Sequence, residues 1–146
     1  MEFDKDFLGK LFEQAVTNPR LRQNFDLRTS PADTSQRMLN ALLPGTKVPI
    51  HRHEDTTETV ICLVGKLEEI IYEEVNEYIY EATSCCGDVT RQRKIREISR
   101  QILSPAEGKF GIQIPAGAWH TINVIEPSVI FEAKDGAYNE SGNTTD

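Results

Sequence analysis

The sequence is poor in the features that mark several large classes of protein. Its three cysteines cannot form a fully paired set, so we expect thiols rather than a disulfide scaffold. No segment approaches the roughly 20 consecutive apolar residues that a membrane-spanning helix needs. Basic residues are also few, 16 against 23 acidic ones, and the net charge of −7 argues against nucleic acid as the main partner. These absences favour a small molecule as the ligand.

What remains is an ordinary globular composition. The 146 residues are 38% hydrophobic and 27% charged, which predicts one domain with a hydrophobic core. The first residues are acidic and lack a continuous apolar run, so we expect no secretory signal and a cytoplasmic location.

Histidine is scarce as well, but the placement of its three copies is informative. His51 and His53 are two residues apart, so on an extended strand both imidazoles project from the same face, with Cα atoms about 7 Å apart. Glu58 follows a polar segment, residues 54–57, that is typical of a turn. Residues 59–64 then read as a buried strand ended by Gly65. This hairpin brings two nitrogens and one oxygen to one face.

The third histidine lies in a second strand–turn–strand segment, residues 112–124. His120 comes just after a turn that contains Pro115 and Gly117. Several imidazoles with a carboxylate suit a divalent transition metal and leave positions open for water or substrate. A single interior histidine is more often a hydrogen-bonded core residue, and a barrel that retains these residues without using a metal is the alternative interpretation.

These two segments carry a family resemblance. The spacing from Gly45 through His51, His53 and Glu58 to Gly65 resembles the first cupin motif. The second motif is matched by Pro115, Gly117 and His120, although Asn123 follows His120 by three positions rather than four and Gly108 lies one residue too far upstream. The resemblance implies a small β-barrel in which the metal ligands are His51, His53, Glu58 and His120.

A narrower resemblance covers most of the chain. Residues 18–22, 36–42, 51–53, 118–121 and 132–138 are together similar to the WbuC-type cupin metalloproteins. That family is often found among bacterial genes for O-antigen and surface polysaccharide. The resemblance therefore implies a link with polysaccharide biosynthesis.

The remaining pattern completes the expected fold, an all-β cupin barrel (a double-stranded β-helix, or jelly roll) with an N-terminal α-helix. A helix over residues 6–17 should pack on the barrel or across a dimer seam. We divide the chain into an N-terminal helical segment (1–30), a barrel domain (31–138) and a flexible tail (139–146). Further expected elements are strands over 36–43, 66–72, 78–83, 94–103 and 128–132, a charged turn at 73–77 and an exposed loop at 84–93. By propensity residues 38–43 fit a helix equally well, and the cupin resemblance favours the strand. Residues 94–103 are also compatible with a helix, because positions 95, 98 and 102 have helical spacing.

Several side chains are candidates for the ligand pocket. Arg20, Arg22 and Arg28 with Asn24 form a basic patch suited to a carboxylate or phosphate, although surface ion pairs are the commoner explanation. Arg37 is either a pocket residue or an outward ion-pair partner.

The catalytic candidates are Glu132, Tyr72 and Arg37, which require a place beside a metal-bound ligand. Glu132 shares a face with Lys134, so the two are a candidate charge pair at the barrel mouth. Trp119 is equally consistent with a pocket wall and with core packing. Cys62 is expected as a small buried hydrophobe, and no role is assigned to Cys85 and Cys86.

Two classes of function fit this pattern. One is a metal-dependent enzyme, of isomerase or dioxygenase type, that acts on a small carbohydrate-like or carboxylated metabolite. The other is a non-catalytic module that binds or senses such a molecule through the metal. Iron, manganese, zinc and nickel all accept this ligand set. The cupin resemblance also implies a homodimer.

Overall fold

The computed structural model describes residues 1–81, 87–136 and 144–145. Within them the elements follow one another as α1 (Lys5–Thr17), β1 (Arg22–Asp26), β2 (Ser35–Leu42), β3 (His51–Arg52), β4 (Glu58–Glu81), β5 (Asp88–Leu103), the 3-10 helix η1 (Pro105–Glu107), β6 (Gly111–Ile114), β7 (Trp119–Asp135) and β8 (Thr144–Thr145). The expected tail, 139–146, lies outside the described residues except for β8.

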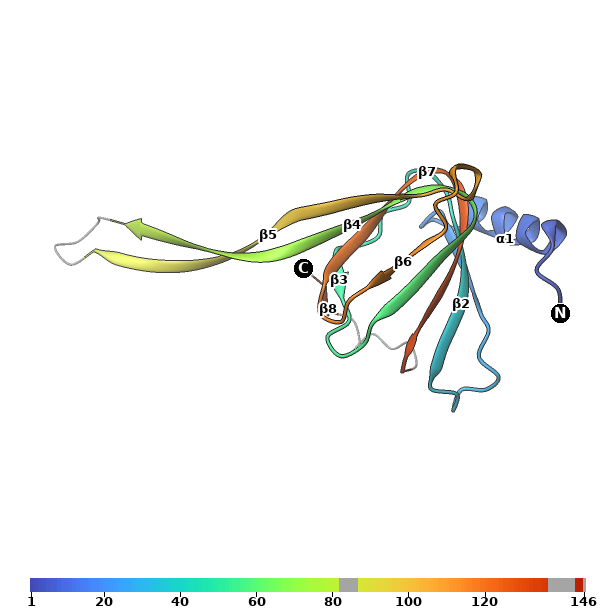
Figure 1. The fold of residues 1–146 in the computed structure, drawn as a ribbon, viewed down its shortest axis with the longest axis horizontal. Helices are drawn as coiled ribbons and strands as arrows, with labels where there is room; N and C mark the ends of the chain where they lie inside the picture. Colours follow the sequence, from blue (N-terminus) through green and yellow to red (C-terminus); the bar gives the residue numbers. More distant parts are fainter. Residues whose placement is uncertain (82–86, 137–143, 146) are drawn as a thin grey trace.

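The strands form a curved antiparallel sheet with β7 at its centre (Figure 1). β7 pairs with β2 along one edge, with β3 at His120, and with β4 from Glu58 to Tyr72. β4 also pairs with β6, and β1 extends the sheet beyond β2. The predicted all-β barrel with an N-terminal helix is confirmed. β1 was not predicted as a strand, because its five residues are mostly polar and show no apolar alternation.

The barrel contains a buried cluster of apolar side chains. The buried cluster consists of Leu42, Val60, Cys62, Leu67, Leu103, Ile114, Val124 and Ile130. Alternate residues of β4 point into it, which follows from the two-residue repeat of a strand. Cys62 is buried in this cluster, as expected, and burial raises the pKa of its thiol to about 11.

The helix α1 lies against the outside of the barrel (Figure 1). Asp4 caps it by accepting a hydrogen bond of 2.9 Å from the Phe7 amide. Its buried residues Leu11 and Ala15 pack against Leu39, Ala41 and Val129 of β2 and β7. The helix therefore packs on the outer face of the barrel. This is one of the two positions that the sequence analysis allowed.

The largest difference from the sequence prediction is the length of β4. The strand does not end at Gly65, which has a φ of 96° and lies at register shifts against β7. It also runs straight through residues 73–77, where a turn was predicted, and the predicted loop is wrong over residues 88–93, which belong to β5. The rest of that loop, 84–87, includes Cys85 and Cys86, which lie outside the described residues.

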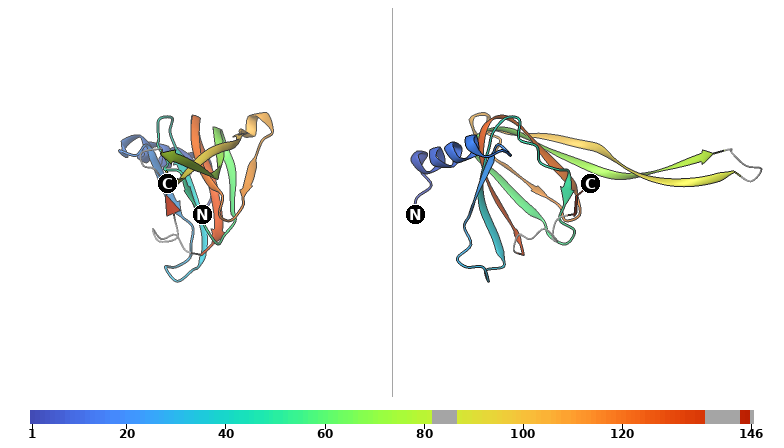
Figure 2. Two further views of the ribbon diagram at one scale, coloured as in Figure 1. Left: turned by 90° about the vertical axis from the view of Figure 1, so that its left-hand side faces the viewer. Right: turned by 180° about the vertical axis from the view of Figure 1, so that it is seen from behind.

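The outer parts of β4 and β5 form a two-stranded ribbon that projects far from the barrel (Figures 1 and 2). Beyond the pair Tyr72–Trp119, β5 is the one strand that pairs with β4 in the described part of the chain. We call this ribbon the arm and define it as Glu73–Glu81 of β4 with Asp88–Arg96 of β5. Among the described residues, no helix is long and apolar enough to cross a membrane.

Candidate metal centre

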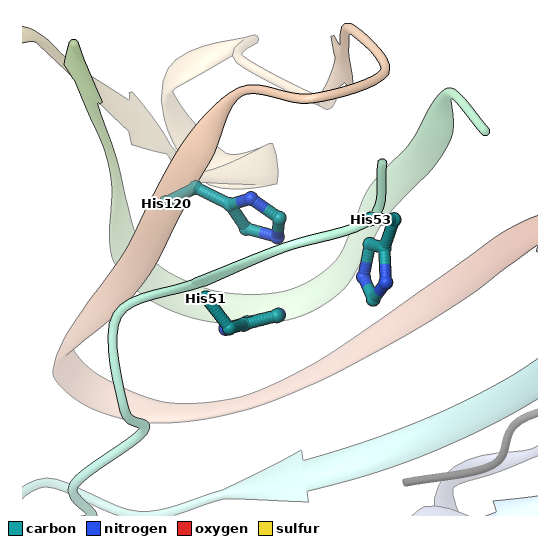
Figure 3. Close-up of side chains that lie close together, drawn as sticks. All are labelled: His51, His53 and His120. Carbon is teal, nitrogen blue, oxygen red and sulfur yellow. The ribbon is translucent and has the colours of Figure 1, made fainter. Parts of the chain in front are cut away.

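The three histidines meet inside the barrel, as Figure 3 shows. His51 on β3 and His120 on β7 are direct cross-strand partners, and His53 follows two residues after His51. One ring nitrogen of each lies within 4.8 Å of the others, and the ring centroids are 4.2 to 5.5 Å apart. His53 and His120 are buried. The predicted convergence of the two segments is present.

The turn before His120 is tied to the strand that carries the other two histidines. The Gly117 amide donates a hydrogen bond of 2.7 Å to the carbonyl of His53, and the Ala118 amide donates to Pro115. Gly117 has a φ of 80°, a conformation that favours glycine. The Pro115–Gly117 turn therefore fixes the two ligand-bearing segments relative to each other.

Backbone carbonyls set the orientation of two of the rings. Nδ1 of His51 lies 2.9 Å from the Pro49 carbonyl, and Nδ1 of His120 lies 2.9 Å from the Ala118 carbonyl. Each Nδ1 therefore carries the proton and donates it, which leaves Nε2 with a free lone pair, as in metal-binding histidines. Within the described part of the chain, His120 Nε2 is buried without a hydrogen-bond partner.

The charge state of the rings also suits a metal. Burial lowers the pKa of His51, and burial together with the neighbouring His51 lowers the pKa of His120 to about 4. Both imidazoles are therefore neutral at pH 7, which is the form that coordinates a cation.

Glu58 adds a carboxylate to the same point. Its Oε2 lies 2.7 Å from His53 Nε2 and 3.9 Å from His120 Nε2. Burial by itself would raise the pKa of Glu58, but the hydrogen bond with His53 and the nearby His120 hold that pKa below its usual value. The carboxylate is therefore anionic beside the neutral rings of His51 and His120.

These separations match the needs of a divalent transition metal. Ligands at about 2.0–2.2 Å from one ion lie roughly 3 Å apart when they are adjacent and about 4 Å apart when they are opposite. The distances from Glu58 to His53 and His120 lie close to this range. Three nitrogens and one oxygen leave positions on the ion for a small ligand.

The site opens into a cavity of about 260 Å³, just below the range of about 300–1,000 Å³ that is usual for drug-sized ligands. Its wall is formed mainly by β1, β2, β3, β4 and β7. The lining residues are Arg20, Arg22, Asn24, Gln36, Met38, Asn40, Val48, Pro49, His51, His53, Glu58, Glu69, His120, Thr121, Ile122, Glu132 and Thr145. The cavity therefore suits a small, polar metabolite.

Two further carboxyl groups line the cavity. Burial and the neighbouring Glu58 raise the pKa of Glu132 to about 8, and burial raises the pKa of Glu69 well above its usual value. Glu69 Oε2 has no hydrogen-bond partner among the described residues. Glu132 is among the residues predicted from the sequence, whereas Glu69 is not. Glu69 has the same strand parity as the buried Leu67, which is the signal that identifies it as an interior residue.

The basic patch divides between the cavity and the surface. Arg20, Arg22 and Asn24 line the cavity, whereas the guanidinium of Arg28 pairs with Asp26 outside it. The Arg22 guanidinium donates to the Lys47 carbonyl (2.8 Å) and to the Thr46 hydroxyl (3.4 Å), which hold it in place. The cavity thus has positive charge in an otherwise acidic chain.

The other candidates lie elsewhere. Arg37 forms an ion pair with Asp33, and neither Arg37 nor Tyr72 is among the cavity-lining residues. Trp119 is buried outside the cavity lining, where its Nε1 donates to Glu74 (2.9 Å) and the guanidinium groups of Arg52 and Arg93 lie over its ring. Lys134 pairs in register with Glu58, and burial lowers its pKa.

Residues 3–83 match the model of a family described as a domain of unknown function (DUF6016). The chain belongs to this family. None of the curated proteins matches it.

Solved structures with the same fold are cupin β-barrels. An oxalate oxidase in complex with the substrate analogue glycolate is 12% identical (TM-score 0.53), and the match covers 82% of this chain but only 53% of that enzyme. This chain thus spans about half the length of the oxalate oxidase. KdgF from Halomonas sp. is 15% identical (TM-score 0.51; 86% and 88% covered), and the capsular polysaccharide assembling protein CapF from Staphylococcus aureus is 16% identical (TM-score 0.50; 85% and 31%). At these identities the likeness shows the fold alone, a cupin-type β-barrel.

Proposed function

We propose that this cupin binds one divalent transition metal through His51, His53, Glu58 and His120 and acts on a small carboxylated or carbohydrate-like metabolite. The single observation that carries the proposal is the convergence of three imidazoles, two of them buried, and one carboxylate in a cavity. Iron, manganese, zinc and nickel all suit this set. When bound, the metal would polarise an oxygen of the ligand.

The opposite charges in the cavity indicate how a ligand would be oriented. Arg22, held by Lys47 and Thr46, offers a fixed guanidinium for a carboxylate. An oxygen elsewhere on the same molecule would then face the histidines. A ligand held at both ends in this way is immobilised, which is the first requirement for a reaction at its middle atoms.

Glu132 is the residue that we propose for proton transfer. Its carboxyl lines the same cavity, and its pKa of about 8 lies near the pH of a cell, so it can both release and accept a proton. Arg37 and Tyr72, the other sequence candidates, have no contact with the cavity that would support such a role.

The setting of this activity is proposed on sequence resemblance. The segments similar to WbuC-type cupins favour a cytoplasmic protein of surface-polysaccharide biosynthesis. Sugar nucleotides and small hydroxy acids are therefore the first compounds to screen.

The metal is tested by elemental analysis of natively purified protein. We expect about one transition metal per chain, and a His120→Ala variant that has lost it. Gln113→Ala is the matched control, because this exposed residue of β6 donates a side-chain hydrogen bond to the Thr59 hydroxyl, is not among the cavity-lining residues, and should leave the metal content unchanged. A wild-type chain without metal after reconstitution would overturn the proposal.

The ligand is tested with the metal-loaded protein. We expect Arg22→Gln to weaken binding of the active acid or sugar nucleotide at least about 10-fold, because it removes a charge-assisted hydrogen bond. Arg28→Gln, outside the cavity, should bind as the wild type does. Substrate-dependent product formation or oxygen uptake identifies an enzyme, whereas a ligand recovered unchanged identifies a binding module.

A further inference from the structure

Buried polar atoms without a hydrogen-bond partner are gathered in one cavity. Among the described residues there are six such side-chain atoms, and five of them belong to residues that line the cavity beside the candidate metal centre. Two of the five are ring nitrogens of His53 and His120. The other three are oxygens: Gln36 Oε1, Asn40 Oδ1 and Glu69 Oε2. Because buried polar groups in proteins are normally hydrogen-bonded, three such oxygens in one cavity indicate a ligand that supplies their partners.

Two of these oxygens come from the inner face of β2. Gln36 and Asn40 lie on either side of Met38, and alternate residues of a strand point to the same face. The cross-strand partner of Met38 is Glu132, so the two amide groups flank the residue proposed for proton transfer. Gln36 is only 5% exposed, which separates its amide from bulk water. β2 thus presents two neutral amides to the cavity.

Glu69 supplies the third oxygen from β4. Its side chain is 2% exposed, and its cross-strand partner on β7, Ile122, also lines the cavity. Burial raises the pKa of Glu69 well above its usual value, and the neighbouring carboxyl groups of Glu58 and Glu132 add to this rise. The carboxyl of Glu69 is therefore protonated at neutral pH, and it can both donate and accept a hydrogen bond.

The chemistry of these three groups selects the part of a ligand that can bind them. An amide oxygen only accepts, so Gln36 and Asn40 require a donor, whereas the protonated Glu69 serves either way. A carboxylate or phosphate offers acceptors alone and would leave both amide oxygens unpaired. An ammonium group donates, but Arg20 and Arg22 in the same cavity oppose a cation. A hydroxyl group donates, accepts and carries no charge, so it is the group that fits all three positions.

The arginine end of the cavity has the opposite requirement. Burial lowers the pKa of His51, and the charge of Arg22 adds to that fall. Burial raises the pKa of Glu132 to about 8, and the same charge opposes part of that rise. The guanidinium of Arg22 therefore lies within electrostatic reach of both the candidate metal centre and Glu132. A carboxylate bound there would leave the rest of a short molecule against the neutral groups.

We infer that Gln36, Asn40 and Glu69 form a hydroxyl-binding subsite, and that the metabolite of this cavity is a polyhydroxylated acid such as a sugar acid. Its carboxylate would lie at Arg20 and Arg22, and its hydroxyl groups on the three neutral side chains. The inference rests on the function proposed above and narrows it. It excludes short dicarboxylates and unsubstituted fatty acids, which have no hydroxyl group to donate.

The test compares acids of equal length that differ in their hydroxyl groups. Gluconate carries a hydroxyl on every carbon except the carboxyl carbon, whereas hexanoate carries none, and galacturonate adds the ring form of a sugar acid. We expect the better of gluconate and galacturonate to bind the metal-loaded protein at least about 100-fold more tightly than hexanoate in titration calorimetry. The reason is that a site built to hydrogen-bond a hydroxyl group rejects an analogue that lacks it. Elemental analysis after the titration checks that the metal has stayed in place.

Gln36→Leu and Glu69→Leu each replace a polar group by an apolar one of similar size. Each should weaken the binding of the preferred sugar acid about 10-fold and leave the binding of hexanoate unchanged. In urea unfolding without acid, both variants should be at least as stable as the wild type, because each change removes a buried polar atom that has no partner among the described residues. A purely structural role would lower the stability instead. Gln113→Leu, an exposed change outside the cavity lining, should leave the binding of both acids unchanged.

Circular dichroism of each variant checks its fold, and the unbranched Gln36→Met or Glu69→Met replaces a leucine variant that does not fold. Equal affinity for the sugar acids and hexanoate, or a preference that both substitutions leave unchanged, would overturn the inference. These outcomes are separate from the metal test. A metal-loaded chain without the preference would refute the subsite but not the metal centre, whereas a wild type that shows the preference but binds no metal would refute the metal centre but not the subsite.

Discussion

At the scale of single residues, burial decides which groups carry charge. His51 and His120 are neutral and Glu58 is anionic, whereas Glu132 and Glu69 are held protonated in the same cavity. A site that binds a cation thus concentrates its negative charge on the carboxylate that adjoins the imidazoles. The acids further away remain neutral hydrogen-bond donors.

Glu132→Gln should change how the stability of the metal-free protein depends on pH. The native chain retains a proton on Glu132 that the unfolded chain releases between about pH 4.5 and 8. The native state thus binds more protons in that window, and its free energy of unfolding falls as the pH rises. The amide mimics the protonated acid, so the variant should lose less stability. Urea unfolding at several pH values measures this, and Glu77→Gln on the arm should retain the wild-type slope.

Cys62 should be nearly inert in the native protein. Its side chain is buried, and a pKa of about 11 leaves little thiolate at pH 8. We expect alkylation by iodoacetamide to be at least about 100-fold slower than for the same cysteine in urea, as measured by mass spectrometry of its peptide. Equal rates in the two states would show that the core around Cys62 opens readily.

At the scale of elements, the sequence predicted the metal-binding segments better than their surroundings. His51, His53, Glu58 and His120 lie in short motifs whose spacing already fixes faces and turns. The run from Glu73 to Glu77 resembles a turn because it is polar, but Arg96, Arg93 and Lys94 lie across from it and make it a strand. A local pattern cannot reveal partners that are about 20 residues away.

Substituting alanine for two glycines should separate the stability lost through a steric clash from the stability lost through an unusual backbone conformation. Gly65 and Gly108 have φ values of 96° and 75°, but a Cβ on Gly65 would lie 2.2 Å from the Pro127 carbonyl oxygen, whereas Gly108 has open space around it. Gly108→Ala should cost about 1 kcal/mol of unfolding free energy, from the backbone alone. Gly65→Ala should cost more than about 3 kcal/mol, because β4 and β7 must move apart.

Urea unfolding of the metal-free variants measures both values. Similar losses for the two variants would mean that the bulge at Gly65 can adjust to a side chain without disturbing the strand pair.

At the scale of the whole molecule, the barrel and the arm are stabilised by different interactions. The barrel encloses an apolar cluster and closes around the four candidate ligands, whereas the arm is held by its own backbone ladder and ion pairs. They meet at Trp119, the only tryptophan, where Glu74 of the arm accepts from the indole and Arg52, between His51 and His53, lies over the ring. The arm is therefore anchored next to the metal centre but shares no core with it.

This difference predicts that added metal slows amide hydrogen exchange in the barrel but not in the arm. A metal at 100 times its Kd stabilises the native state by about 2.7 kcal/mol, so amides that exchange only through global unfolding should slow about 100-fold. Peptides from the centre of β7 belong to this class, because β7 pairs with β2, β3 and β4. Arm amides exchange by local opening and should be unaffected at a fixed protein concentration. The same metal added to His120→Ala should slow neither set, and equal slowing of both sets in the wild type would show that arm and barrel unfold as one unit.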